Sequence, residues 1–204
     1  MTKATTLPKL MTFAEFLDWK PENSCYELYK GIVVEMQPKG KHEEISVFLA
    51  VEFACLFRQR KLDYFLPKQA LVKVFADNSG YLPDVLVVDR NALEDEPLWE
   101  KYSTLTKGKS IPLVVEIVSS NWRDDYLTKL RDYEEIGINE YWIVDYLGIG
   151  GSRYIGNPKQ PTISVYNLID GEYQVQYFRD NEQIKSPTLP ELDLTVNQIF
   201  QVRC

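Results

Sequence analysis

Two acidic residues lie at positions where the sequence predicts the ends of strands. Asp84 follows Pro83 at the start of an apolar run, and Glu116 directly follows the apolar run Leu113–Val115. If the two strands pair, their carboxylates come close together. Two such acids repel each other unless a cation or a shared proton intervenes, and Mg²⁺ is a cation that prefers oxygen ligands. Asp84 is therefore a candidate metal ligand, or else a turn carboxylate bonded to backbone amides.

Lys129 adds a positive charge to this set. It lies in the helix predicted for Asp124–Ile136, within the side of the helical wheel that carries most of the apolar residues. One interpretation is that its stem is buried while its ammonium group reaches water. The other is that the ammonium group meets the carboxylates inside the protein, beside a scissile phosphate. The wheel places Tyr126, Leu127, Leu130, Tyr133 and Ile136 on the apolar side, and Thr128, Arg131, Asp132 and Glu135 opposite.

These residues belong to a stretch, Pro112–Asp145, that predicts a strand, a turn, a helix and a second strand. Gly137 is a typical residue for ending the helix. The segment from Asn91 to Ser110 is charged and weakly patterned, which predicts a loop with one helical turn. The rest of the chain predicts helices at Thr12–Leu17, Lys41–Arg60 and Val196–Val202, hairpins at Cys25–Met36 and Ile163–Phe178, and strands at Tyr64–Leu66, Ala70–Phe75 and Leu82–Asp89.

Composition limits the class of protein. The 204 residues, with 45% hydrophobic and 26% charged side chains, are typical of one globular domain spanning 1–204. No apolar run approaches the roughly 20 residues that cross a membrane, and the N-terminus lacks the apolar core of a secretory signal, so we expect a cytoplasmic protein. The three cysteines form no CxxC pair, and His42 is the only histidine, which argues against structural zinc.

Several motifs, taken in order, resemble the Uma2 family (DUF820). This family is abundant in cyanobacteria and belongs to the PD-(D/E)XK restriction-endonuclease-like superfamily. The resemblance covers about residues 10–185 and implies an α/β fold with a mixed α+β sheet, an N-terminal hairpin and flanking helices. The motifs are Pro83–Asp84, Glu116–Ser119, Asp125-x-x-x-Lys129, Tyr133, Gly137, Glu140–Asp145 and the hairpin residues Tyr26–Leu28 and Gly31–Met36.

The resemblance implies a Mg²⁺-dependent endonuclease that hydrolyses DNA, with Mn²⁺ able to replace Mg²⁺. Asp84 and Glu116 would hold the metal together with the main-chain carbonyl of Ile117. The superfamily lysine normally lies two residues after the acid, where this chain has Val118. The resemblance implies that Lys129 takes over its role.

Five further residues are weaker candidates. The resemblance implies that Glu27 assists the site, although it could equally be an exposed strand residue. Ser119 and Asp125 would support the site or cap the helix. His42 is either structural or part of the site, and Gln69 is predicted on a strand from which it could reach the cleft.

Three functions compete on these observations. The joint presence of Asp84, Glu116 and Lys129 favours a nuclease, because a binding module has no need of a lysine against two acids. The net charge of −7 favours a catalytically silent module that binds DNA or a protein partner. A glycosidase would use paired carboxylates but leaves Lys129 unexplained. A homodimer is a further expectation, since nucleases that cut duplexes often pair their sites.

Overall fold

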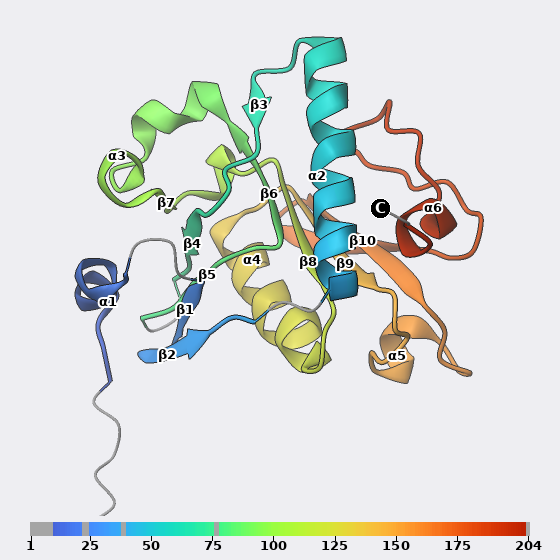
Figure 1. The fold of residues 1–204 in the computed structure, drawn as a ribbon, viewed down its shortest axis with the longest axis horizontal. Coiled ribbons are helices and arrows are strands. Elements are labelled where there is room, and N and C mark those ends of the chain that lie inside the picture. The colour runs from blue at the N-terminus through green and yellow to red at the C-terminus, as the bar shows by residue number, and fades with distance from the viewer. Residues whose placement is uncertain (1–9, 22–24, 38–39, 76–77, 203–204) are drawn as a thin grey trace, which may run out of the picture.

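The computed structural model of the protein describes residues 10–21, 25–37, 40–75 and 78–202, and consists of two β-sheets with helices packed around them (Figure 1). The smaller sheet has the strand order β2-β1-β5-β4-β7. Only its β4–β7 pair is parallel. Its strands are β1 (Tyr26–Tyr29), β2 (Ile32–Glu35), β4 (Leu71–Lys73), β5 (Gly80–Tyr81) and β7 (Thr104–Leu105).

The predicted N-terminal hairpin forms the edge of this sheet. Lys30 and Gly31 both have positive φ, 49° and 79°, which is the backbone of a tight two-residue turn matched to the twist of β1 and β2. Helix α1 (Phe13–Trp19) packs against it and begins at Thr12 with the predicted capping box, completed by Glu15.

The larger sheet has the order β11-β10-β9-β8-β6-β3 and carries the stretch predicted from residue 112 to 145. Strand β8 runs parallel to β9 and antiparallel to β6. In the β6–β8 register Val85 faces Val115, and continuing that register by one residue places Asp84 opposite Glu116, as expected. The strands are β3 (Tyr64–Phe65), β6 (Val85–Asp89), β8 (Leu113–Ile117), β9 (Glu140–Asp145), β10 (Thr162–Ile169) and β11 (Glu172–Phe178).

Helices cover both faces of this sheet. The long helix α2 (Gly40–Arg60) and the short α6 (Val196–Phe200) pack on one face, where the ring of Phe53 meets the ring of Trp142 edge-on at 5.7 Å. The segment formed by η3 (Asp124–Lys129) and α4 (Leu130–Ile136) packs on the other face. Every residue of β8 and β9 is buried as a result, including Glu116, which shares the α4 face with Val114.

The helix predicted at residues 124–136 differs from a regular α-helix. Its first part, η3, is a wider π-helix, a form that often marks functional sites. The expected apolar side was wrong at two positions: Leu127 is 39% exposed, whereas Asp132 is 1% exposed. Asp132 is buried because its carboxylate accepts a hydrogen bond from the Tyr81 hydroxyl at 2.5 Å, and such a partner allows a polar group to replace an apolar one.

The segment from residue 91 to 110 contains more structure than the loop predicted for it. It holds the 3₁₀ turns η1 (Arg90–Asp95) and η2 (Gly108–Ser110), helix α3 (Trp99–Tyr102) and strand β7. The buried side chain of Glu96 organises the segment by accepting hydrogen bonds from the backbone amides of Thr106 and Lys107. A further short helix, α5 (Ser152–Ile155), follows β9. Across the described ranges, no helix has the length and apolarity that crossing a membrane requires.

Gly108 has no room for a side chain. A Cβ atom there would lie 2.3 Å from the carbonyl oxygen of Ile136 and 2.3 Å from the carbonyl carbon of Gly137, both in the backbone at the end of α4. We expect Gly108→Ala to lower the free energy of unfolding by about 3 kcal/mol, since backbone cannot yield as a side chain does. Urea denaturation followed by tryptophan fluorescence measures this. Gly40→Ala is the control, because its Cβ meets nothing within 4 Å; equal stability of the two variants would contradict the expectation.

Candidate active site

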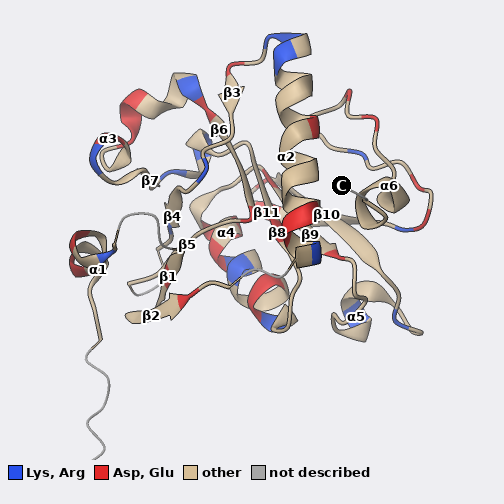
Figure 2. Ribbon diagram, in the orientation of Figure 1, with Lys and Arg blue, Asp and Glu red and all other residues tan. Residues whose placement is uncertain are grey.

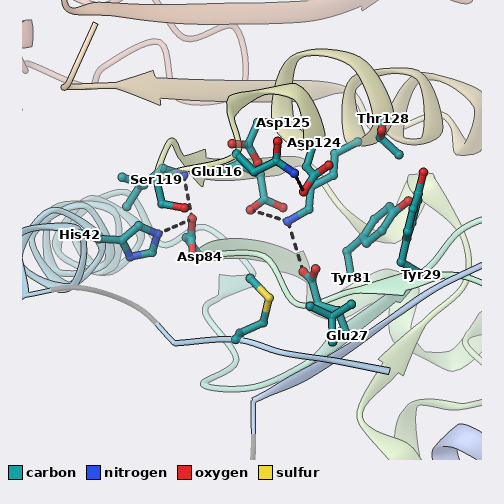
Figure 3. Close-up of a pocket in the computed structure, with 15 residues that line it drawn as sticks. Glu27, Tyr29, His42, Tyr81, Asp84, Glu116, Ser119, Asp124, Asp125 and Thr128 are labelled. Carbon is teal, nitrogen blue, oxygen red and sulfur yellow. Dashed lines mark hydrogen bonds and ion pairs between the residues drawn. The ribbon is translucent and has the colours of Figure 1, made fainter. Parts of the chain in front are cut away.

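A cavity of about 140 Å³ lies where the β1–β2 hairpin, the start of α2, the end of β8 and η3 meet (Figure 3). Figure 3 shows Glu27, Asp84 and Glu116 reaching this space from different parts of the chain. The cavity combines five carboxylates with one lysine and one histidine. Its lining residues are Glu27, Tyr29, Val34, Met36, His42, Tyr81, Asp84, Glu116, Ile117, Ser119, Asn121, Asp124, Asp125, Thr128 and Lys129.

Lys129 is buried at the centre of these acids, with 5% of its surface exposed. Its Nζ lies 3.2 Å from Glu27 Oε1 and 3.1 Å from Glu116 Oε2. The interpretation that its ammonium group reaches water is therefore wrong, and the inward placement is confirmed. Burial opposes the charge, but the carboxylates outweigh it and raise the pKa of Lys129 well above its usual range. Lys129 thus remains a cation and is not a general base at neutral pH.

Each carboxylate oxygen of Glu116 has a partner. The Tyr133 hydroxyl donates to Oε1 at 2.7 Å, and the Lys129 ammonium group lies against Oε2. Burial, together with repulsion from Asp84 and Glu27, raises the pKa of Glu116 to about 8 despite the nearby lysine. Without a bound cation, Glu116 therefore favours its protonated form at neutral pH.

Asp84 is positioned by two neighbouring elements. Its Oδ2 accepts a hydrogen bond from the backbone amide of Ile117 at 2.7 Å, and lies 3.1 Å from His42 Nε2. Its main-chain carbonyl accepts a hydrogen bond from the Ser46 hydroxyl of α2 at 2.8 Å. Burial opposes protonation of His42, but the hydrogen bond and charge of Asp84 outweigh it and raise the pKa of His42. Asp84 thus accepts a hydrogen bond from a backbone amide, as one of its two interpretations predicted, and it also lines the cavity.

Of the other three acids, two are buried beside the lysine. Glu27 is 6% exposed, so the interpretation of an exposed strand residue is wrong; its Oε1 also accepts a hydrogen bond from the Leu82 amide at 2.9 Å. Asp125 is 8% exposed, and burial, with repulsion from Glu116 and Asp84, raises its pKa well above the usual range although Lys129 opposes this. Both side chains therefore lie close to the same ammonium group.

The remaining candidates are placed differently. His42 and Ser119 line the cavity, whereas Gln69 does not: it lies in a bend before β4, where its side-chain amide contacts the Cys25 sulfur at 3.4 Å. The helical segment after β8 has no side-chain cap at its start, so neither Ser119 nor Asp125 serves as one.

Sequence reasoning missed two tyrosines. Tyr133 positions Glu116 by its hydroxyl, and the Tyr81 ring lies 5.4 Å from Lys129 Nζ while its hydroxyl binds Asp132. Tyr133 was placed on the apolar side of the helix and among the family motifs, but was given no role. A buried tyrosine usually finds a partner for its hydroxyl, and this rule was the signal that could have linked it to Glu116.

The pKa of Glu116 predicts a pH dependence of stability. A carboxyl whose pKa is raised on folding binds more protons in the folded than in the unfolded state between pH 4.5 and about 8, so its contribution falls as the pH rises through this range. We expect unfolding free energies, measured with a chelator present, to fall between pH 5 and 8 by about 1–3 kcal/mol more in the wild type than in Glu116→Gln. Parallel pH profiles would contradict the raised pKa.

The donor atoms of the cavity fit a hard divalent cation. Within the described residues, no three His, Cys, Asp or Glu side chains group as a ready-made metal site. Asp84, Glu116 and Ile117 nevertheless line one cavity, each can supply an oxygen donor, and a bound cation would relieve the repulsion that raises the pKa of Glu116. Mg²⁺ commonly uses one or two carboxylates and retains water, which matches this set.

Comparisons with known proteins agree with this architecture. The family model Uma2, described as "Putative restriction endonuclease", matches residues 13–197. A crystal structure described as "a putative nuclease belonging to DUF820", from Anabaena variabilis, superposes with a TM-score of 0.69 at 17% sequence identity, over 94% of this chain and 98% of that one. At this identity the superposition shows the shared restriction-endonuclease-like fold. Curated proteins give no match. Because the family model matches most of this chain, the chain belongs to the Uma2 family.

Proposed function

We propose that this protein is a Mg²⁺-dependent endonuclease that hydrolyses phosphodiester bonds of DNA. The observation that carries the proposal is the buried ammonium group of Lys129 between Glu27 and Glu116, with Asp84 beside them in the same cavity. Asp125 is the fourth carboxylate around this cation. Burying a cation among carboxylates costs free energy, and apolar residues in their place would make a more stable core. A site that binds a divalent cation and a phosphate would account for this cost.

Each residue has a distinct part in this proposal. Asp84, Glu116 and the Ile117 carbonyl would hold Mg²⁺, which supplies Lewis-acid polarisation of a phosphoryl oxygen when bound. Lys129, held as a cation by its carboxylates, stabilises negative charge developing on the phosphate. Glu27 orients the Lys129 ammonium group, while Tyr133 and His42 fix the two metal-binding carboxylates.

The proposal is tested by incubating the purified protein with supercoiled plasmid and with single-stranded DNA. Separate reactions contain Mg²⁺, Mn²⁺ or a chelator. We expect cleavage products from at least one of the two substrates with either metal, and none with the chelator. Glu116→Gln, prepared in parallel, should show no cleavage, because it has one fewer anionic metal ligand. Equal cleavage by Glu116→Gln would identify a contaminant, and absence of cleavage in every arm would favour a DNA-binding or protein-binding module.

A further inference from the structure

A cluster of aromatic rings and arginines lies next to the active-site cavity. Trp122 and Arg123 directly precede η3, and Arg153 and Tyr154 belong to α5. The ring centroids of Trp122 and Tyr154 are 6.2 Å apart, and both rings pack on Tyr126 at 6.1 and 4.8 Å. We call these five residues the arginine–aromatic surface.

Each arginine of this surface lies over a ring. The Arg123 Cζ is 4.7 Å from the centre of the Trp122 ring, and the Arg153 Cζ is 4.5 Å from that of Tyr154. Both arginines are exposed, and within the part of the chain that the structure describes neither forms an ion pair. Stacking occupies the flat face of a guanidinium group and leaves its N–H donors at the edge, where they can bind a phosphate with two hydrogen bonds.

The rings have a firm base. Tyr126 is fully buried, and a Cβ at Gly151 would come within 3.0 Å of the Trp122 ring, so the backbone before α5 packs directly on that ring. The same loop is anchored by Asp145, whose Oδ2 accepts a hydrogen bond from the Gly150 amide at 2.8 Å. The rings under both arginines are therefore held in place by packing and by this hydrogen bond.

The surface adjoins the cavity along the chain. Asn121 and Asp124, which flank Trp122 and Arg123 in the sequence, both line the cavity, and Asp125 precedes Tyr126. Figure 2 shows a blue basic residue on α5, and blue basic residues beside red acidic ones along the segment labelled α4, where Arg131 pairs with Asp132. The cavity itself is rich in carboxylates and repels phosphates, so a phosphate chain needs cations such as these at its border.

The depth of the cavity favours single-stranded over duplex DNA as the substrate. Glu116, Lys129 and Glu27 are 2%, 5% and 6% exposed in a space of about 140 Å³. A regular duplex is too broad to bring a phosphate to such recessed groups, whereas a single strand can enter with its backbone. Half-buried aromatic rings beside a basic border are also the pattern by which proteins bind single strands.

We propose that a single-stranded DNA segment next to the scissile phosphate binds across the arginine–aromatic surface. Arg123 and Arg153 contact its phosphates, and an unpaired base stacks on the accessible part of the Trp122 ring. This inference rests on the proposed function and adds the strand state of its substrate.

The test measures binding without cleavage. Fluorescence anisotropy with a labelled 12-nucleotide single strand, and with the matching duplex, is recorded in chelator at several salt concentrations. We expect the single strand to bind more tightly than the duplex. The double variant Arg123→Gln/Arg153→Gln should weaken single-strand binding about tenfold or more, and lower the slope of log affinity against log salt by about 1.4, for two lost phosphate contacts.

Arg58→Gln/Arg90→Gln is the matched control. Both of these arginines are exposed and lie near the other end of α2, and Arg90 also stacks on a ring, that of Phe65 at 4.4 Å. Thermal unfolding confirms that each variant is folded. Unchanged single-strand affinity in the Arg123/Arg153 variant, or equal affinity for the duplex, overturns the inference. Binding that depends on Arg123 and Arg153 without cleavage in Mg²⁺ would support this inference while rejecting the proposed nuclease. Cleavage by the wild type, with binding that does not depend on Arg123 and Arg153, would support the proposed nuclease and reject this inference.

Discussion

Asp84→Asn is expected to slow DNA cleavage strongly while the protein remains folded. Asparagine has nearly the same shape and can still accept the hydrogen bond that the Ile117 amide donates to Asp84 Oδ2. It lacks the negative charge that a divalent cation needs, and it removes one of the acids that repel Glu116. We expect the cleavage rate to fall about 1,000-fold, equivalent to about 4 kcal/mol of transition-state stabilisation. Calorimetry should show weaker Mg²⁺ and Mn²⁺ binding.

The matched control is Asp170→Asn. Asp170 is exposed in the turn between β10 and β11 with a positive φ of 53°, a conformation that asparagine adopts readily. This variant should keep the stability, metal affinity and cleavage rate of the wild type. If Asp84→Asn bound Mg²⁺ as tightly as Asp170→Asn does, Asp84 would not be a metal ligand.

Lys129→Met is expected to separate cleavage from metal binding. Methionine fills much of the lysine volume but leaves Glu27, Glu116 and Asp125 without their cation. Cleavage should fall about 100- to 1,000-fold, the effect of removing one preorganised charge-stabilising group. Mg²⁺ binding should persist or strengthen, because the competing ammonium group is gone. Single-turnover cleavage and calorimetric titration measure the two quantities on the same sample.

The same variant should also lose stability in a pH-dependent way. Breaking a buried ion pair by removing one partner costs about 3–5 kcal/mol when the remaining charge stays buried. The unpaired carboxyls escape part of this cost by binding protons, so the loss should be smaller at pH 5 than at pH 8. Lys68→Met, at an exposed lysine, should match the wild type at both pH values. If Lys129→Met cleaved DNA at the rate of the wild type, the role of Lys129 would be structural only.

Local sequence patterns were sufficient for most of the fold. The capping box at Thr12 and Glu15, the turn at Lys30–Gly31 and the periodic apolar positions of α2 each specify their element through contacts within a few residues. The apolar runs that became β8 and β9 are long enough to be recognised without knowing their neighbours. The acids Asp84 and Glu116 could be predicted as neighbours because they lie at equivalent ends of two strands that pair.

Tertiary structure decided what the charged and polar side chains do. The helical wheel left Lys129 with two interpretations, and only the arrival of Glu27 from the hairpin, 102 residues away, selects the buried one. Asp132 is buried and Leu127 is exposed, the reverse of the prediction. The π-helix η3 and the hydrogen bond from the Tyr81 hydroxyl favour burial of the acid, and apolar periodicity predicts neither of them. Tyr133 acquired its role in the same way, from Glu116 on a neighbouring strand. Apolar burial is encoded by local pattern, whereas the burial of a charge depends on partners that only folding brings together.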